Sequence, residues 1–342
     1  MSPATTEERL ADKLAFLRRP QTYPGGRGDV EARETHMSWV FLDGRCAYKL
    51  KKPVCRPYLD YSCLRQRRLM CEREVRLNRR LADWVYVGVA ALVRDAAGNL
   101  ALRNAGEALD GQVVEWLVQM RRLPDDLMLD HAIRHDAVRE ADALRTATHL
   151  ATFFAKAPGV ARTADAHVRS LRRLLAEHAA AIDSAVATAG LRSLHAGHVR
   201  DRLSRFLDTD RALVEERVAA GRVIEGHGDL RPEHVFLGEP PAIIDCIEFS
   251  RELRIVDPLD ELAFLTMECT LLGAGRWGEL FLQVYLQKSA DHAPQMLMQF
   301  YMGLRAFLRL RLALGHLADT QDPQHWADRA RQYLALAERF AP

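Results

Sequence analysis

One stretch, from Ile224 to Phe249, constrains the fold more than any other part of this 342-residue chain. It reads IEGHGDLRPEHVFLGEPPAIIDCIEF, so short apolar runs alternate with small groups of polar residues. Val235–Leu237 and Ala242–Ile244 are typical of short buried strands, and the residues between them, GEPP, are typical of a tight turn. The pattern therefore predicts a β-hairpin.

Three chemically active residues flank this predicted hairpin. His234 precedes its first strand, Asp245 follows its second strand, and Asp229 lies one loop upstream. Because a hairpin brings its two ends together, we expect His234 and Asp245 to lie side by side. A carboxylate beside metal ligands suits phosphoryl transfer, which depends mainly on positioning and charge neutralisation. The alternative is that these residues only form turns or cap helices.

The motifs HGDLRPEHVFL and IIDCIEF together resemble the aminoglycoside phosphotransferase family. This family is related to choline and fructosamine kinases and has a protein-kinase-like fold, in which Asp-x-x-x-x-Asn is followed by a metal-binding Asp. The resemblance implies that Asp229 is the catalytic base and that Asp245 and His234 bind metal. His234 is a departure, because it stands where the family has Asn.

The N-terminal part supplies a candidate nucleotide site. Residues 38–50 predict a β-hairpin around an Asp-Gly turn, and its second strand contains Ala47-Tyr48-Lys49. This matches the Ala-x-Lys of the kinase strand whose Lys holds the α- and β-phosphates. Lys51 and Lys52 follow directly, so the choice of Lys49 stays open, and a solvated basic edge strand is the alternative. If Lys49 holds phosphate, we expect replacement of Lys51 or Lys52 to have little effect.

Residues 62–82 predict an amphipathic helix at the place where kinases carry the Glu that pairs with this Lys. The resemblance implies that Glu74 takes this role. Glu72 is the competitor, and it lies on a different face of the helix.

Two further parts of the nucleotide site follow from the resemblance alone. Backbone groups at the end of the strand 113–120 would face adenine, and the residues concerned are Gln119, Met120 and Arg121. No glycine-rich loop precedes the 38–50 hairpin, so Ser38 is the candidate for contacting phosphate there. A P-loop is also absent from the sequence.

The rest of the chain is predicted to be mostly helical, with long helices over 137–156, 168–189 and 194–220 and further helices over 281–340. Asp257 is predicted to cap a helix and to brace the catalytic loop, and Glu261 stands where the family has a second Asp. Arg305 and Arg309 share one helix face. We expect them to be solvated, with binding of a substrate anion as the alternative.

Composition sets the outer limits. A formal net charge of +2 gives no sign of a nucleic-acid binder, and no apolar run is long enough for a membrane span. The six cysteines form no Cys-x-x-Cys pair, and we expect reduced thiols in the cytoplasm.

The resemblance implies an α+β, bilobal fold like that of protein kinases. It would comprise a helical N-terminal extension over residues 1–24, a small β-rich lobe over 25–120 and a larger helical lobe over 121–342, with ATP between the lobes.

The predicted function is ATP- and Mg²⁺-dependent phosphorylation of a hydroxyl group on a small molecule. A catalytically inactive nucleotide-binding or scaffold protein is the alternative, favoured by His234 and the missing glycine loop. If His234 binds metal, we expect a preference for Mn²⁺ over Mg²⁺, because imidazole is a softer ligand than an amide oxygen. No acidic run marks a pocket for a polycation, so we expect a neutral or anionic substrate. The sequence does not specify the substrate or the oligomeric state.

Overall fold

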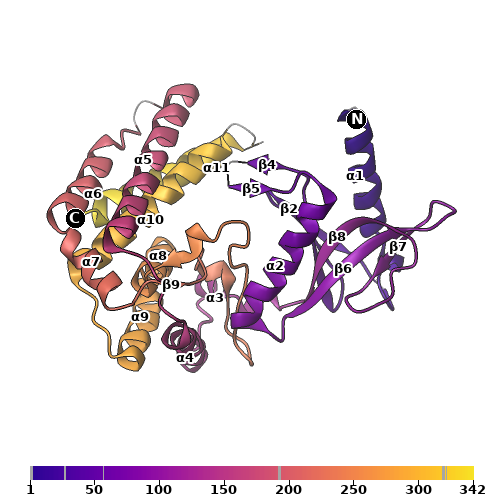
Figure 1. Ribbon diagram of the computed structural model, residues 1–342, viewed down its shortest axis with the longest axis horizontal. Coiled ribbons are helices and arrows are strands. Elements are labelled where there is room, and N and C mark those ends of the chain that lie inside the picture. The colour runs from indigo at the N-terminus through magenta and orange to yellow at the C-terminus, as the bar shows by residue number, and fades with distance from the viewer. Residues whose placement is uncertain (1–2, 27, 57, 192–193, 318–319, 321) are drawn as a thin grey trace. The chain divides into compact units, whose positions relative to one another are not determined.

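The chain divides into two compact units, which we describe separately (Figure 1). A computed structural model describes residues 3–26, 28–56, 58–191, 194–317, 320 and 322–342. The first unit comprises Met1–Leu127 together with Ala242–Arg251, and the second comprises Met128–Pro241 together with Glu252–Pro342. The first unit is built on an antiparallel β-sheet and the second is mostly helical, as a bilobal kinase-like α+β fold requires.

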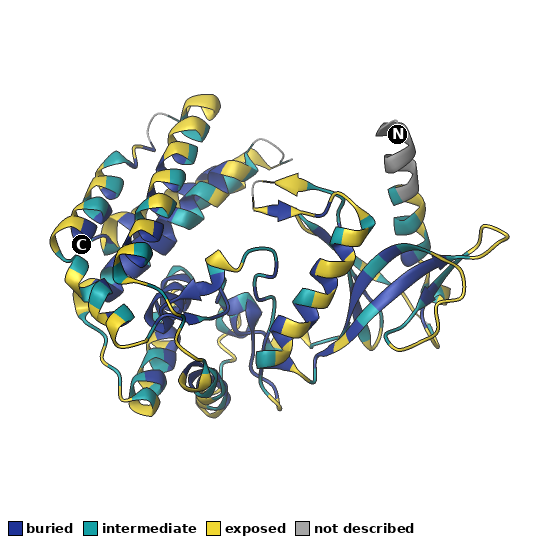
Figure 2. Cartoon of the chain, in the orientation of Figure 1, coloured by how far each residue is buried: buried dark blue, intermediate teal, exposed yellow. Residues whose placement is uncertain are grey.

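The sheet of the first unit contains six strands in the order β1-β2-β3-β8-β6-β7. Their bounds are β1 Glu31–Glu34, β2 Ser38–Leu42, β3 Cys46–Lys51, β6 Tyr86–Arg94, β7 Leu100–Arg103 and β8 Gln112–Arg121. Every neighbouring pair is antiparallel, and β2 is joined to β3 through the predicted Asp-Gly turn. The long strand β6 is largely buried, whereas β8 is buried mainly over residues 117–119, as Figure 2 shows.

Successive side chains of β3 point to opposite faces of the sheet, and a different helix packs on each face. Tyr48 and Leu50 pack with residues of helix α1, Pro3–Leu17, in an apolar cluster that includes Leu14 and Leu17. On the opposite face, Lys49 and Lys51 meet helix α2, Leu64–Ala82. The N-terminal helix is therefore an integral part of the first unit.

Smaller elements complete the first unit. These are the paired strands β4 Cys55–Arg56 and β5 Leu59–Asp60, and the short strand β11 Ala242–Ile243. The residues after β11 pack on α2: the backbone N–H of Cys246 donates to Asn78 Oδ1 at 2.9 Å. Phe249 joins an apolar cluster with Leu59 and Met70. Residues 242–251, which sequence reasoning assigned to the second lobe, thus belong to the first unit.

The second unit is built from helices with a few short strands. The helices are α3 Leu129–Arg134, α4 Glu140–Lys156, α5 Ala164–Ala189, α6 Gly197–Thr209, α7 Arg211–Ala219, α8 Pro258–Leu271, α9 Gly275–Ser289, α10 Gln295–His316 and α11 Pro323–Phe340. The strands are β9 Ile224–Glu225, which pairs antiparallel with β12 Ile255–Val256, and β10 Val235–Phe236. Pro258 through Cys269 are all buried, so α8 forms the centre of this unit (Figure 2).

The structure differs from the sequence prediction at one helix and divides the predicted 235–244 hairpin between the two units. The predicted helix over 194–220 is two helices, α6 and α7, because Asp210 leaves the helical conformation between them. Both strands of the predicted 235–244 hairpin form, as β10 and β11. They fall in different units, so the expected proximity of His234 and Asp245 stays a prediction.

None of the helices within the described residues combines the length and the apolar character that a bilayer span needs.

Candidate functional site

The first unit contains a buried carboxylate that two lysines share. Glu74 on α2 is fully buried, and its Oε1 lies 3.0 Å from Lys49 Nζ while its Oε2 lies 2.5 Å from Lys51 Nζ. Both lysines reach the same carboxylate because residues two apart on a strand point to the same face. The pairing compensates the desolvation of a charge that would otherwise be unfavourable in the interior.

Asp245 completes this arrangement. Its Oδ1 lies 2.5 Å from Lys49 Nζ, yet 45% of its side chain remains exposed. The residue has a φ of 62°, a left-handed conformation that Asp tolerates better than most residues. Its backbone N–H donates to the Tyr86 hydroxyl at 3.1 Å, which fixes the bend in the chain. One oxygen of a well-placed carboxylate is thus held by Lys49, and the group itself is open to solvent.

A second acid of the same segment, Glu248, is bound by Lys51. Lys51 Nζ donates to Glu248, the Tyr61 hydroxyl donates to the same carboxylate oxygen, and Lys51 lies 3.4 Å from that hydroxyl. Lys51 has no exposed side-chain area, whereas 15% of the Lys49 side chain is exposed. The two lysines therefore have different environments despite their shared partner.

Charge pairing determines the protonation of this cluster. Burial alone would lower the pKa of Lys49, but the carboxylates of Asp245 and Glu74 outweigh it and hold that pKa well above its ordinary value. Burial would raise the pKa of Glu248, and the ammonium of Lys51 reverses this and lowers it. Lys49 and Glu248 are therefore both charged at neutral pH.

These contacts refine the prediction for the lysine cluster. Lys49 lies between Glu74 and Asp245, while Glu72 is an exposed residue that pairs with Arg68. The effect of replacing Lys51 stays a prediction, but Lys51 is buried between two carboxylates, so we now expect its replacement to disturb this cluster. Strand alternation was the sequence signal that placed Lys51 on the same face as Lys49.

Ser38 lies on the lysine face of the sheet. It pairs with Lys51 across the β2–β3 ladder, and directly paired residues share a face. Its side chain is buried, and its backbone N–H donates to Thr35 Oγ1 at 3.0 Å in the preceding turn.

The backbone of Gln119–Arg121 is already paired on both sides. Gln119 is in register with Tyr48 of β3 and Gly88 of β6, and the N–H of Arg121 donates to the Val85 carbonyl at 2.8 Å. The Gln119 side chain accepts from the backbone N–H of Ala105 at 2.9 Å. These residues therefore belong to a central strand of the sheet, although the ladder with β6 is irregular between Tyr86 and Gly88, opposite Met120 and Gln119.

In the second unit, acids of α8 brace the His227-Gly228-Asp229 loop. Glu261 Oε1 accepts from the backbone N–H groups of His227, at 2.8 Å, and of Gly228. Arg305 holds Asp260 in a bidentate pair at 2.7 Å and donates to the Gly228 carbonyl at 3.4 Å. Gly228 has a φ of 89°, a conformation that favours glycine. The loop is therefore held by the side chains beneath it.

Asp257 caps a helix as the sequence predicted, whereas its predicted bracing of the catalytic loop stays a prediction. It caps α8 by accepting from the Leu259 N–H at 3.0 Å, and it forms a buried bidentate pair with Arg217. Arg217 also pairs with Asp291, so one guanidinium binds two carboxylates.

The Asp229 carboxylate is surrounded by cations of the second unit. Arg231 Nε donates to Asp229 Oδ2 at 3.0 Å, and Arg231 also pairs with Glu233. Burial would raise the pKa of Asp229, but Arg231 and the neighbouring His234 and Arg309 lower it to about 2. The carboxylate is thus ionised throughout the neutral range, with 27% of the side chain exposed.

His234 uses both ring nitrogens within its own loop. Nδ1 lies 2.8 Å from the Asp229 carbonyl oxygen, and Nε2 lies 3.3 Å from Arg231 Nη2. A guanidinium has no acceptor, so Nε2 accepts from Arg231 and Nδ1 donates to the carbonyl. This bonding favours a packing role and opposes the metal-ligand role, because a metal at Nε2 would displace a hydrogen bond from a cation.

The expectation that Arg305 and Arg309 are solvated is wrong. Arg305 is buried against Asp260, and Arg309 pairs with Glu268 at 2.8 Å beneath the Tyr333 hydroxyl. Their acidic partners lie on α8, far from them in sequence, which is why helix periodicity alone did not reveal the pairing.

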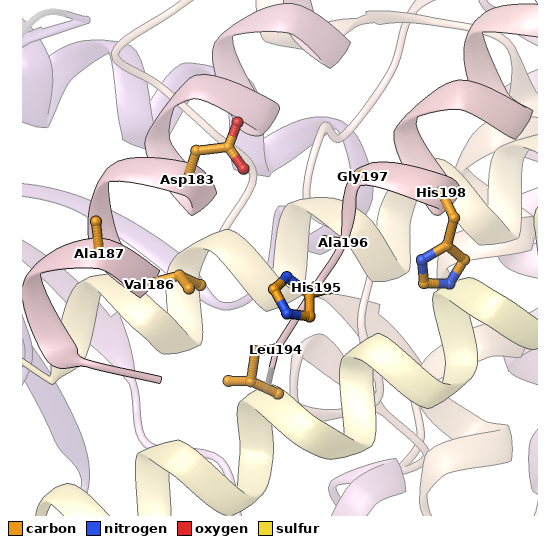
Figure 3. Close-up of a pocket in the computed structure, with 8 residues that line it drawn as sticks. All are labelled: Asp183, Val186, Ala187, Leu194, His195, Ala196, Gly197 and His198. Carbon is orange, nitrogen blue, oxygen red and sulfur yellow. The ribbon is translucent and has the colours of Figure 1, made fainter. Parts of the chain in front are cut away.

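A cavity elsewhere in the second unit contains none of the predicted site residues. It lies between the last turns of α5 and the start of α6, and Asp183, Leu194, His195 and His198 line it (Figure 3). Over the part of the chain that the structure describes, no group of three or more His, Cys, Asp or Glu residues is arranged to hold a metal ion.

The fold places this chain among proteins with an aminoglycoside phosphotransferase- and choline kinase-like fold. A choline/ethanolamine kinase family protein from Mesorhizobium loti is 18% identical, with 97% of this chain and 94% of that chain covered and a TM-score of 0.51. A thermostable aminoglycoside phosphotransferase mutant is 14% identical, with 98% of both chains covered and a TM-score of 0.51. Plasmodium vivax ethanolamine kinase is 8% identical, with 90% and 82% covered and a TM-score of 0.50.

Sequence comparison adds relatives without assigned activity. Uncharacterized proteins of Mycobacterium tuberculosis and Mycobacterium bovis are 32% identical over 318 residues, which are 91% of this chain. The chain spans 60% of the length of these relatives. No protein-family model matches the chain.

Glu261 provides a test of the loop bracing through pH. Burial raises its pKa to about 7, and its Oε2 has no hydrogen-bond partner in the described structure. A raised pKa contributes stability that is complete below the unfolded value, near 4.3, and lost as pH rises through about 7. The unfolding free energy of the wild type relative to Glu261→Gln should therefore fall by roughly 2–3 kcal/mol between pH 5 and pH 8.

Urea unfolding of both proteins across this pH range measures the difference. The exposed Glu279 on α9 provides the control, since Glu279→Gln should shift stability by the same amount at every pH. A Glu261→Gln difference that does not change with pH would show that Glu261 is ionised in the folded protein.

Proposed function

We propose that the protein is an ATP- and Mg²⁺-dependent phosphotransferase that acts on a hydroxyl group of a small molecule. The observation that carries this proposal is the Lys49–Glu74–Asp245 arrangement, in which an oriented ammonium lies beside a solvent-open carboxylate. The fold, shared with small-molecule kinases, is consistent with it. The chain covers only part of its longer relatives, so this activity is proposed for the chain itself.

Lys49 would hold phosphate oxygens. Glu74 orients its ammonium group from the buried side, and 15% of the lysine side chain remains exposed. An ammonium so oriented neutralises phosphate charge without further reorganisation, which is the main electrostatic requirement of phosphoryl transfer.

Asp245 would hold the metal ion. A half-exposed carboxylate suits Mg²⁺, which prefers oxygen ligands and keeps several waters, so a complete protein cage of ligands is unnecessary. When bound, Mg²⁺ supplies charge neutralisation for the phosphates. We assign His234 to positioning of the Asp229 loop, because both of its ring nitrogens are hydrogen bonded there.

Two further nucleotide contacts concern Ser38, proposed near phosphate, and the backbone of Gln119–Arg121, proposed near adenine. Ser38 shares the lysine face of the sheet, which supports its assignment near phosphate. Gln119–Arg121 lie in the central strand β8, between β3 and β6. Their assignment to adenine therefore rests on the family resemblance alone.

Asp229 would orient the substrate hydroxyl and accept its proton. A carboxylate with a pKa of about 2 is a weak base, so its main contribution is to position the hydroxyl for attack and to take the proton late. The hydrogen bonds from α8 to His227 and Gly228 hold the loop that presents this carboxylate.

An inactive nucleotide-binding protein is the rival. It predicts ATP binding through the first unit and no turnover with any acceptor. Retention of an ionised, loop-anchored Asp229 favours the enzyme, since a carboxylate that only paired with Arg231 would not need to stay 27% exposed.

Replacement of Asp229 tests the enzyme directly. Asp229→Asn keeps the shape of the side chain and removes the proton acceptor, so turnover should fall by about 10²–10⁴-fold while ATP affinity is retained. ADP release across a panel of hydroxyl-bearing metabolites provides the measurement. Asp165→Asn, an exposed change in the same unit, is the control and should not alter turnover. Turnover within about threefold of wild type would remove Asp229 from this role.

The charge around Asp229 predicts the substrate class. Arg231 and Arg309 are interspersed with Glu233 and Glu268, so this region lacks the excess of carboxylates that a polycationic aminoglycoside would need. We expect phosphorylation of a neutral or anionic metabolite. Bacteria that express the protein should show the same kanamycin sensitivity as bacteria that express Asp229→Asn, and a rise in resistance with the wild type alone would contradict this prediction.

A further inference from the structure

We propose that Lys51 is a positioning residue, which clamps the Asp245 segment and helix α2 to strand β3 so that Lys49 can exchange Asp245 for phosphate. This inference rests on the proposed function of Lys49 and Asp245. Nothing in the sequence motif assigns a role to the second lysine, and three contacts within the first unit define it.

All three N–H donors of the Lys51 ammonium have hydrogen-bond partners. An ammonium has three N–H donors, and Lys51 faces three partners, Glu74, Glu248 and the Tyr61 hydroxyl. The side chain has no exposed area. Contact with a ligand would therefore require a buried ion pair to break, which is strongly unfavourable.

Lys49 has fewer ion-pair partners than Lys51 has hydrogen-bond partners, and one of them is partly exposed. It has two partners among the described residues, Glu74 and Asp245, and Asp245 is the half-exposed one. Exchange of Asp245 for a phosphate oxygen would keep Lys49 paired through Glu74. Lys51 would meanwhile keep Glu74 in place, because it holds the other carboxylate oxygen.

Two of the acids that pair with Lys49 and Lys51 lie close together in the sequence. Asp245 and Glu248 belong to one short segment, Asp-Cys-Ile-Glu, while Lys49 and Lys51 belong to one strand. A contact between Lys51 and Glu248 thus fixes the segment even when Asp245 changes partner. Phe249 extends this anchor into the apolar cluster of Leu59, Tyr61 and Met70.

Hydrogen exchange tests the clamp without reference to catalysis. In the full chain, Lys51→Met should raise the exchange rate of the amides over 243–250 by about tenfold or more, because their anchor is lost. Without Lys51, the Glu248 carboxylate would be buried without its ammonium partner. If Lys51→Met does not fold for this reason, the double variant Lys51→Met/Glu248→Gln, which removes that charge as well, takes its place in the measurement. Lys52→Met is the matched control, since Lys52 pairs with the exposed Glu34 at the edge of the sheet.

Metal binding separates positioning from a general loss of stability. Mn²⁺ affinity in the presence of ATP, measured by electron paramagnetic resonance, should fall roughly 10–100-fold in the Lys51 variants, as it does when outer-shell partners of metal ligands are removed. ATP affinity without metal should change little. Lys49→Met should instead lose ATP affinity in the absence of metal. Lys51→Arg should keep more of the Mn²⁺ affinity than Lys51→Met does.

Two outcomes would overturn the clamp: unchanged exchange over 243–250 in the Lys51 variants, or an equal increase throughout strands β6 and β8. Absence of ATP and Mn²⁺ binding by the wild type would instead contradict the proposed function. In that case the exchange measurement still decides whether Lys51 holds the segment.

Discussion

The buried carboxylate of Glu74 is the constraint on which the first unit depends. A fully buried charge must be paired, and Glu74 is paired twice, through both of its oxygens. This requirement fixes which face of β3 meets α2 and therefore which face meets α1. It also explains why residues 242–251 pack with the sheet although most of their neighbours in sequence do not. Their two acids, Asp245 and Glu248, pair with the same two lysines.

In the second unit, buried carboxylates are also paired with cations, but the cations are arginines and not lysines. Three buried acids stand at the start of helix α8: the N-cap Asp257, and Asp260 and Glu261 in its first turn. Arg217 and Arg305 pair with the first two, while Glu261 accepts backbone N–H groups of the His227-Gly228-Asp229 loop. Burial raises the pKa of Glu261, whereas nearby cations lower that of Asp229. Similar groups are thus kept in different states: one carboxyl braces the loop and another stays ionised at its surface.

The sequence was informative where chemistry and periodicity agree. Spacing and alternation predicted the β2–β3 hairpin, the helix that carries Glu74 and the cap at Asp257, and the family resemblance predicted the bilobal α+β fold. Prediction failed where a residue's environment depends on a distant element. The burial of Lys51 and the pairing of Arg305 and Arg309 require partners far away in sequence, so local pattern suggested solvated or dispensable cations. The break at Asp210 was missed because both flanking segments are helical by composition.

We propose that the first unit contains a metal-dependent nucleotide site built from Lys49, Glu74 and Asp245. Calorimetric titration with ATP, with and without Mg²⁺, tests it most directly when wild type is compared with Asp245→Asn. We expect Mg²⁺ to strengthen ATP binding to the wild type. The Asn variant should lose that strengthening and keep the weaker metal-free binding through Lys49, because only the metal carboxylate has changed. Equal strengthening by Mg²⁺ in both proteins, or no ATP binding by the wild type, would contradict the account.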